Sequence, residues 1–269
     1  MFEPVIKWSG SKRSQAENIL KYFPKEIDTY YEPFCGGCSV LRRLLDSDIK
    51  VKHYICSDLN EDLINLWNLI KNNPQSVIDS YEENHIKFLK DKQYYYVVRK
   101  RFNKEKNPRD FLFLLRTCAN GLSRFNLKGE FNSPVHIGRN GIKPQTFAKI
   151  CNEWSKLLRE KNVNFICQSY EQIKTKEKDF IYLDPPYANT KGMYYGVLNY
   201  DNLWNWMKIQ DAKYVLSFDG KTNKEEDNTF NVPNELYSKH VYIKSGNSGF
   251  RRITGKSNDT IVYESLYVK

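Results

Sequence analysis

Short apolar runs alternate with helical patterns at the start of the chain. Residues 30–34 and 51–57 are β-branched and aromatic runs that end in turn residues, which is typical of buried strands. Between them, residues 39–45 repeat leucine at helical spacing, and we expect Ser39 to be the N-cap of this helix. After the second run, Asn60 is expected to cap another helix. This βαβα order predicts a parallel sheet covered by helices.

Helical patterns then replace the strand signals over residues 72–162, apart from a polar loop at residues 120–143. Strand signals return in later runs at residues 163–167, 180–183, 214–217, 237–243 and 260–268. The sequence shows no repeat and no linker rich in Pro, Gly or Ser. We therefore predict an α/β domain made of residues 1–71 and 163–269, interrupted by a helical insertion at residues 72–162.

Composition narrows the class of protein. The 269 residues include 40% hydrophobic and 14% aromatic positions, which is too many for a disordered chain. The longest apolar run is residues 111–115, far shorter than the roughly 18 residues that a membrane span needs. The first residues lack the basic and apolar regions of a secretory signal, so we expect a cytoplasmic protein.

Positive charge is concentrated in two parts of the sequence. The chain carries 42 Lys and Arg against 32 Asp and Glu, a net charge of +10. Residues 87–109 contain nine basic and two acidic residues, interleaved with five aromatic ones. A second basic segment at residues 244–256 contains Arg251 and Arg252. Such segments favour a nucleic-acid partner, although a lysine-rich solvated surface would give the same net charge.

The six cysteines give little support for a metal site. Only Cys35 and Cys38 have the spacing of zinc ligands, and neither a second cysteine pair nor a suitably spaced histidine pair accompanies them. We therefore expect buried thiols and no bound metal.

Residues 180–187 hold the strongest candidate for chemistry. An apolar strand delivers Asp184 at its carboxyl end, where open α/β sheets bind their ligands. Pro185 and Pro186 hold the backbone extended, so that the Asp184 carboxylate and the Pro185 carbonyl become two acceptors at a fixed separation. Beside them, Tyr187 offers a flat surface on which a base could stack while its planar amino group meets both acceptors. The plainer interpretation is a strand-ending turn with a buried tyrosine.

A second junction between a strand and a helix contains Gly36 and Gly37. Glycines at such a place let a ligand approach the backbone, and the helix that follows offers free N–H groups. Asp58 ends the next strand, 22 residues after Gly36, which is the spacing at which an acidic side chain binds ribose hydroxyls. Together these features indicate an adenosine-containing cofactor. The absence of a G-x-x-x-x-G-K-[ST] motif argues against an NTPase.

These motifs, taken in order, carry a resemblance to a known family. They are residues 7–12 (Lys-Trp-Ser-Gly-Ser-Lys), 32–37 (Glu-Pro-Phe-Cys-Gly-Gly), 57–58 (Ser-Asp) and 184–187 (Asp-Pro-Pro-Tyr). Over nearly its whole length the chain resembles the Dam family of DNA adenine-N6 methyltransferases. The resemblance implies S-adenosyl-L-methionine as cofactor and the Rossmann-like mixed sheet of the methyltransferases that use it. It also implies that the helical insertion recognises DNA.

The resemblance assigns roles to single residues. The expected cofactor-binding residues are Trp8, Lys12, Phe34, Gly36, Asp58 and Asp184. The expected catalytic residues are Asp184, Pro185 and Tyr187. By the same resemblance, residues 34–37 surround the methionine part of the cofactor and Asp58 binds its ribose. Residues 168–170 depart from the family, which often has an Asp there, so contacts to the adenine ring of the cofactor are not assigned.

Residues 120–134 are similar to the DNA-reading hairpin of the family. Arg124 is expected to read a guanine, because its two donors match O6 and N7 in the major groove, although a phosphate or an acidic side chain would also suit an arginine. The expected DNA-binding residues are Asn120, Leu122, Arg124, Asn126, Pro134, Arg139 and Arg251. The chain differs from close relatives at Ala119 and in residues 135–139, so no recognition sequence such as GATC is assigned.

The implied reaction transfers a methyl group from S-adenosyl-L-methionine to N6 of an adenine flipped out of double-stranded DNA. It would act at a specific site, within a restriction-modification system or outside one. We expect a monomer in solution, with room for more than one copy on a DNA site. Methylation of cytosine N4, methylation of adenine in RNA, and DNA binding without catalysis are the alternatives.

Overall fold

The computed structural model describes residues 2–186, 198–222, 228–247 and 261–269. Its α-helices are α1 (Ala16–Leu20), α2 (Ser39–Leu45), α3 (Glu61–Asn72), α4 (Pro74–Lys90), α5 (Tyr94–Glu105), α6 (Pro108–Thr117), α7 (Pro144–Glu160) and α8 (Tyr200–Lys208). Its 3-10 helices are η1 (Ala119–Gly121), η2 (Tyr170–Gln172) and η3 (Asn234–Leu236). Its strands are β1 (Glu26–Pro33), β2 (Lys50–Asp58), β3 (Asn164–Cys167), β4 (Phe180–Leu183), β5 (Lys213–Thr222), β6 (Lys239–Asn247) and β7 (Ile261–Val268). Within these described stretches, no helix combines the length and the apolar character needed to cross a membrane.

The described strands form one sheet in the order β3, β2, β1, β4, β5, β7, β6. Neighbours from β3 to β5 run parallel, whereas β7 is antiparallel to both β5 and β6. The order of strands along the chain reverses between β1 and β4, and doubly wound sheets bind their ligands at such a switch point. The predicted Rossmann-like mixed sheet is confirmed.

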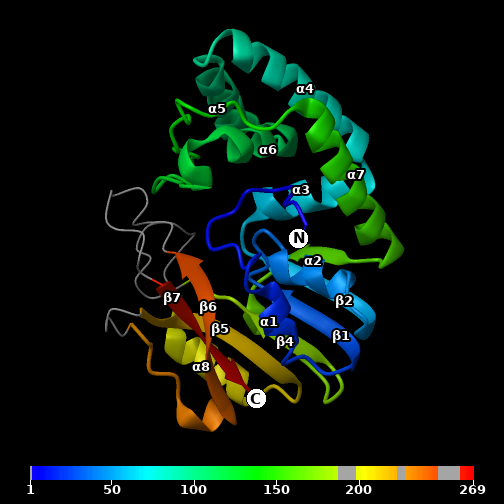
Figure 1. Ribbon diagram of the computed structural model, residues 1–269, viewed down its shortest axis with the longest axis vertical. Helices are drawn as coiled ribbons and strands as arrows, with labels where there is room; N and C mark the ends of the chain where they lie inside the picture. Colours follow the sequence, from blue (N-terminus) through cyan, green and yellow to red (C-terminus); the bar gives the residue numbers. More distant parts are fainter. Residues whose placement is uncertain (1, 187–197, 223–227, 248–260) are drawn as a thin grey trace.

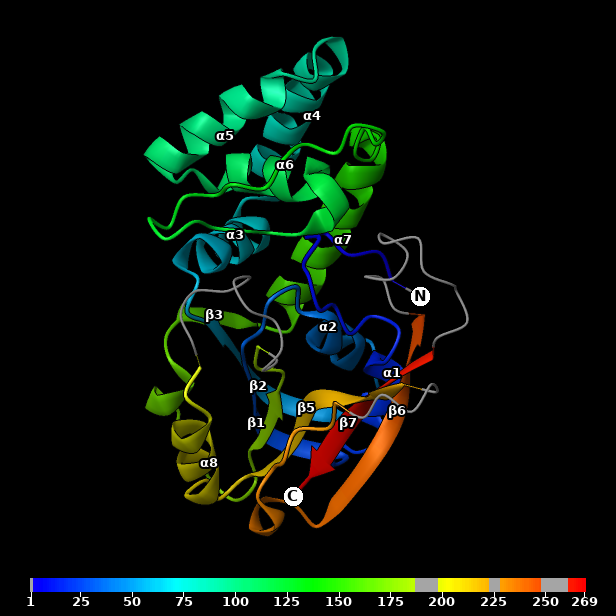
Figure 2. The same ribbon diagram turned by 90° about the vertical axis from the view of Figure 1, so that its left-hand side faces the viewer.

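Helices cover both faces of the sheet. Successive side chains of its central strand β4 point to opposite faces, and both sets are buried. In β4, Phe180 and Tyr182 belong to a core that also contains residues of α1, α2 and α3. Ile181 and Leu183 belong to a second core, shared with α8. Figure 2 shows α2 and α8 on opposite sides of the strands. Both faces of β4 are therefore buried.

The helices predicted within residues 72–162 are present on either side of the loop at residues 120–143, and they gather at one end of the molecule. Figures 1 and 2 show α4, α5, α6 and α7 together beyond α3. Both α6 and α7 pack on α3. The rings of Trp67 in α3 and Trp154 in α7 lie 5.1 Å apart, and both side chains are buried. One apolar core therefore runs from the sheet into the helical layer.

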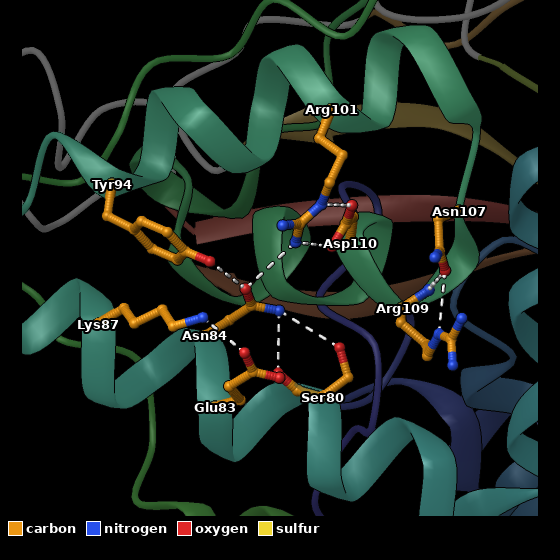
Figure 3. Close-up of polar contacts among 9 residues, drawn as sticks. All are labelled: Ser80, Glu83, Asn84, Lys87, Tyr94, Arg101, Asn107, Arg109 and Asp110. Carbon is orange, nitrogen blue, oxygen red and sulfur yellow. Dashed lines mark hydrogen bonds and ion pairs between the residues drawn. The ribbon is translucent and has the colours of Figure 1, made fainter.

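A partly buried polar network joins three helices of this layer (Figure 3). Asn84 of α4 accepts a hydrogen bond from the Tyr94 hydroxyl of α5 at 3.0 Å and another from Arg101 at 3.3 Å. Arg101 also forms a two-pronged ion pair with Asp110 of α6, at 2.6 Å and 2.5 Å. Asp110 is 2% exposed, and such paired contacts fix geometry as well as charge. The network thus fixes α5 against α4 and α6.

The two predicted helix caps have opposite outcomes. The side chain of Asn60 accepts a hydrogen bond from the Leu63 N–H at 3.0 Å, so this prediction is confirmed. The prediction for Ser39 is wrong, because the N-cap position belongs to Cys38 in a left-handed conformation with φ of 52°, and no side chain caps the helix. Ser39 is instead the first helical residue and shares a hydrogen bond with Ser11 at 2.8 Å.

Some boundaries and burial expectations also change. Strand β1 begins at Glu26 rather than at residue 30, and it ends before Phe34, whose φ is 65°. Five of the six cysteines are buried as expected, and burial raises the pKa of Cys35 to about 12. Cys167 is exposed, contrary to expectation, because β3 is an edge strand in which only Phe165 is buried. The short helices α1 and α8 were not predicted.

Candidate active site

A cavity of about 490 Å³ opens at the carboxyl ends of β1 and β4, beside the switch point. Its wall is built from segments far apart in the sequence, among them residues 8–12, 34–40, 58–60, 169–171 and 184–186. All the residues expected to bind the cofactor line it: Trp8, Lys12, Phe34, Gly36, Asp58 and Asp184. Its size is that of an ordinary site for a small ligand.

The two glycines after β1 make room for the side chain of Trp8. A Cβ atom at Gly36 would lie 2.8 Å from Cδ1 of Trp8, and one at Gly37 would lie 3.0 Å from its Cβ. Gly36 also has a φ of +47°, which residues with a Cβ rarely adopt. Trp67 holds the loop by donating a hydrogen bond to the Gly36 carbonyl at 2.9 Å. The Trp8 side chain therefore requires glycine at both positions, whether or not a ligand also needs this space.

Asp58 presents a carboxylate at the end of β2. Its Oδ2 accepts a hydrogen bond from the Gly36 N–H at 3.2 Å, and its Oδ1 accepts one from the Asn60 N–H at 3.0 Å. Burial raises the pKa of Asp58, and these backbone donors oppose the rise. A carboxylate has about four acceptor sites, so Asp58 keeps capacity for the hydroxyls of a ligand in the cavity.

Lys12 lies between two carboxylates. Its Nζ atom is 3.0 Å from Oδ1 of Asp184 and 3.6 Å from Oε2 of Glu264 on β7. The Gly10 carbonyl also accepts from it at 3.4 Å. Lys12 is 4% exposed, and although burial lowers its pKa, Asp184 and Glu264 raise that pKa well above its usual range. The residue expected to contact the cofactor thus also touches the expected catalytic acid.

Glu32 is a second carboxyl group in the wall of the cavity. It is 3% exposed, and its Oε2 accepts a hydrogen bond from the Tyr30 hydroxyl at 2.7 Å. Burial raises the pKa of Glu32 to about 8; the hydrogen bond from Tyr30 opposes the rise, and the charge of Asp184 adds to it. Glu32 is therefore mostly protonated near neutral pH. The sequence motif contains Glu32 but gave it no role.

The turn after β4 carries Asp184 and Pro185 at the cavity. The Tyr200 hydroxyl of α8 donates a hydrogen bond to the Pro186 carbonyl at 3.0 Å, which ties the turn to the helix. Pro185 is buried, whereas Asp184 is partly exposed. The third expected catalytic residue, Tyr187, lies outside the described residues.

One part of the wall is apolar and aromatic. The rings of Phe34 and Tyr170 lie 5.4 Å apart at 34°, and Leu59, next to Asp58, is 56% exposed. All three side chains line the cavity, and such a surface suits the heteroaromatic ring of a ligand. The family resemblance assigns no role to residues 168–170, and no sequence motif includes Leu59. The apolar residue directly after Asp58 was the available signal.

The expected DNA-reading segment forms a small hairpin. Isolated bridges pair Cys118 with Val135 and Phe125 with Phe131. Arg124 lies between them with an exposed side chain, and its backbone N–H donates to Ser133 Oγ at 2.9 Å. Within the described part of the chain, no hydrogen bond or ion pair engages its guanidinium group.

The other residues of the DNA-binding prediction fall in different environments. Asn126 is used by the hairpin turn, because its side chain accepts from the N–H groups of Lys128 and Glu130 at 2.9 Å and donates to the Glu130 carboxylate at 2.8 Å. Pro134 and Arg139 are exposed, and Leu122 is half-buried. Asn120 lies in η1, whereas Arg251 lies outside the described residues.

The hairpin and the cavity share a wall. Ser123 and Phe125 of the hairpin line the cavity together with Asp184 and Pro185. Phe125 packs edge-on against Phe131 at 5.6 Å and contacts Phe111 of α6 at 6.2 Å. The insertion therefore contributes directly to the candidate active site.

Comparison with known proteins agrees with this geometry. A family model described as D12 class N6 adenine-specific DNA methyltransferase matches residues 8–226. Type II methyltransferase M.MjaIII of Methanocaldococcus jannaschii is 38% identical over 205 residues, which cover 69% of this chain and 69% of that protein. The DNA adenine methylase of Escherichia coli K12 is 33% identical over 189 residues, which cover 68% of this chain and 64% of that protein. The matched region thus spans less than two thirds of that relative.

More distant matches extend over more of the chain. Type II methyltransferase M.CviBI of Paramecium bursaria Chlorella virus NC1A is 26% identical over 277 residues, which cover 90% of this chain and 99% of that protein. Among solved structures, the rRNA methyltransferase aviRa of Streptomyces viridochromogenes covers 94% of this chain and 81% of its own at 11% identity. Its TM-score of 0.39 is too low to bear on fold or function. The match of the family model and the identity to M.MjaIII place this chain in the family of D12 class N6 adenine-specific DNA methyltransferases.

Proposed function

We propose that this protein transfers a methyl group from S-adenosyl-L-methionine to N6 of a flipped-out adenine in double-stranded DNA. The observation that carries the proposal is the shared wall of the cavity, in which Ser123 and Phe125 of the hairpin lie with Asp184 and Pro185. A base that enters beside a DNA-reading hairpin would meet these acceptors directly. Recognition and chemistry would then occur in one place.

The residues of the cavity fit the proposed cofactor. The Ser9 hydroxyl lines the cavity wall, is buried and has no hydrogen-bond partner within the described stretches, so a polar ligand group would satisfy it. Asp58 would accept from the ribose hydroxyls, and Leu59 and Tyr170 would contact the adenine ring. Trp8, Phe34 and Gly36 would border the methionine part. The cofactor, when bound, supplies an activated methyl group on a sulfonium.

The protein groups would act on the target amine. The amine of adenine is a poor nucleophile because its lone pair is delocalised into the ring. Asp184 and the Pro185 carbonyl would accept its two hydrogens and so direct the lone pair of the nitrogen toward the methyl group. Lys12 would keep Asp184 ionised, which makes its carboxylate a stronger acceptor. Positioning of the two reactants accounts for much of the rate, as in other reactions between two bound molecules.

Extraction of the base from the duplex costs a few kcal/mol, part of which stacking can offset. In this proposal Tyr187 supplies the stacking surface, and Arg124 reads a base while Leu122, Pro134 and Arg139 contact the DNA nearby. Asn120 and Arg251 stay in the proposed DNA-binding set. Asn126 would act there by shaping the hairpin.

The proposal divides the chain by task. Residues 1–71 and 163–269 would form the catalytic domain, and residues 72–162 would recognise the target. We propose that the protein acts as a monomer in solution and needs no metal. Within the described part of the chain, no cluster of three or more His, Cys, Asp or Glu residues could hold a metal ion.

The test is methylation of a plasmid in vitro. Purified protein is incubated with unmethylated plasmid and S-adenosyl-L-methionine, nucleosides are analysed by mass spectrometry, and single-molecule sequencing maps the modified positions. N6-methyladenine at one recurring sequence is expected. Asp184→Ala should abolish the product while DNA binding in a mobility-shift assay persists, whereas the exposed control Asp211→Ala should stay active.

Three results would contradict the proposal. N4-methylcytosine as the product would identify a cytosine enzyme. Methylation of structured RNA in preference to duplex DNA would identify an RNA enzyme. Failure to bind S-adenosyl-L-methionine in calorimetry would leave a DNA-binding protein without this activity.

A further inference from the structure

A carboxylate behind the cavity wall contacts the lysine that pairs with Asp184. Glu264 lies on β7 and is not among the described residues that line the cavity. Its Oε2 atom is 3.6 Å from Nζ of Lys12, and its side chain is 12% exposed. Because Nζ is also 3.0 Å from Asp184, two carboxylates on different segments share one ammonium group. The family model ends at residue 226 and does not include Glu264.

Two other elements hold Glu264 in place. Its Oε1 atom accepts a hydrogen bond from the Gln15 amide at 3.3 Å and another from the Ser245 hydroxyl of β6 at 3.1 Å. Gln15 also donates to Ser245 Oγ at 2.5 Å and is 3% exposed. Because these donors fix one carboxylate oxygen, the other oxygen stays directed toward Lys12.

Titratable groups from several segments surround the pair of Lys12 and Asp184. Burial lowers the pKa of Lys12, but Asp184 and Glu264 raise it strongly, and Tyr182 of β4 acts in the same direction. Glu32 of β1 is mostly neutral near pH 7, because burial raises its pKa to about 8. Among the described residues, Lys12 therefore carries a positive charge beside Asp184, and Glu264 carries a negative charge beside Lys12.

We propose that Glu264 is a positioning residue for methyl transfer, which holds the Lys12 ammonium from behind the cavity wall and limits how tightly it pairs with Asp184. This inference rests on the proposed function. A carboxylate without a nearby cation protonates more readily, whereas one fully engaged by an ammonium is a weaker acceptor for another donor. A shared Lys12 keeps Asp184 ionised and still able to accept a hydrogen from the target amine.

The substitution Glu264→Gln tests this role. Glutamine keeps the shape of the side chain and an oxygen for Gln15 and Ser245, but it removes the charge beside Lys12. We expect kcat to fall about tenfold, because Lys12 then pairs fully with Asp184. Loss of a nearby negative charge should also lower the pKa of Asp184. The acidic limb of the plot of kcat against pH should therefore move about one pH unit lower.

A second measurement needs neither cofactor nor DNA. The carboxyl ¹³C resonance of Asp184, assigned with Asp184→Asn, is titrated in the protein alone, and its midpoint should also move lower in Glu264→Gln. Glu264→Asp, which keeps the charge, should restore most of the activity and the original midpoint. The control is Asp179→Asn, which removes a buried carboxylate that accepts from the N–H groups of Thr29 and Lys176. It should lower stability without moving either midpoint.

The outcomes separate this inference from the proposed function. A wild-type protein that methylates no nucleic acid would reject the proposed function. An active wild-type protein whose acidic limb and Asp184 midpoint stay unchanged in Glu264→Gln would reject only the positioning role, whatever the change in kcat. Equal defects in Glu264→Asp and Glu264→Gln would also reject it, because they would show that shape rather than charge matters.

Discussion

The indole of Trp8 fills the space beside Cα of Gly36, where a Cβ atom would lie 2.8 Å from Trp8 Cδ1 and 2.9 Å from Nε1. This contact sets the path of the loop after β1. The same loop supplies the N–H group that binds Asp58 and the carbonyl that accepts from Trp67. A single methyl group added at Gly36 would therefore disturb the part of the cavity that contacts the proposed cofactor.

We expect Gly36→Ala to weaken cofactor binding about tenfold or more, measured by calorimetry with S-adenosyl-L-methionine. The left-handed conformation alone costs about 1–2 kcal/mol of stability once a Cβ is present. Gly129→Ala is the matched control, because Gly129 also has a positive φ, 72°, but lies in the hairpin turn. It should share the cost of the backbone conformation but bind the cofactor normally. Equal affinity in both variants would contradict this view of the loop.

Arg124 is exposed on the hairpin. If it reads a base, its loss should change the sequence preference at one position of the DNA site. Arg124→Ala should cost about 1–3 kcal/mol of binding to the recognised sequence and relax the preference at one base pair. The control is Arg109→Ala, since Arg109 is exposed on the same insertion but donates to the Asn107 side chain at 3.2 Å (Figure 3). Methylation of a library of DNA sequences measures the preference. Uniform loss across all sequences would instead indicate a phosphate contact.

Helix α5 presents two lysines on one exposed face. Lys100 and Lys104 are one helical turn apart beside Tyr96, and within the described part of the chain neither has an ion-pair partner. If each meets a DNA phosphate, the double variant with both lysines changed to Ala should reduce the slope of log affinity against log salt by about 1.8. The control is the same double change at Lys149 and Lys156 of α7, which should leave the slope unaltered. Figure 1 shows α7 well away from α5.

The raised pKa of Glu32 predicts that the stability of the protein depends on pH. This pKa is raised from 4.5 to about 8 in the folded protein, mainly by burial. Between these values the folded state binds more protons than the unfolded state, so the free energy of unfolding falls as pH rises through this range. Glu32→Gln should remove this loss and become more stable than the wild type toward pH 8, by an amount on the order of a few kcal/mol.

Chemical denaturation across that pH range measures the difference. Glu82→Gln, at an exposed site on α4, controls for the change of residue type and should track the wild type. Parallel curves for Glu32→Gln and the wild type would show that Glu32 does not bind its proton more tightly on folding.

Local patterns in the sequence predicted local structure well. The cap at Asn60 precedes a clearly amphipathic helix, so its signal lies within a few residues. Ser39 failed because the left-handed conformation of Cys38 belongs to the loop that packs against Trp8, which is distant in the sequence. Glu264 could not be found in this way, since its partner Gln15 is 249 positions away. Prediction of such contacts requires the order of the strands, which single residues do not encode.

The motifs located the cavity but not all of its wall. Asp58 and Asp184 were found because strand ends in open sheets face a ligand. Leu59 and Tyr170 were missed because an apolar residue after a strand usually belongs to the core. The left-handed Phe34 could not be anticipated either, since phenylalanine rarely adopts this conformation and only the fold around it explains the choice.

The position of Ser123 and Phe125 in the cavity wall affects how enzymes of this family could be re-engineered or could diversify. Because the hairpin supplies part of the wall of the proposed active site, we expect that replacing the insertion would also affect turnover. A grafted hairpin from another member of the family would bring a new sequence preference and a new cavity wall together. New target sequences would therefore be acquired with changes in rate, and variants that restore activity should appear around the cavity as well as at the DNA surface.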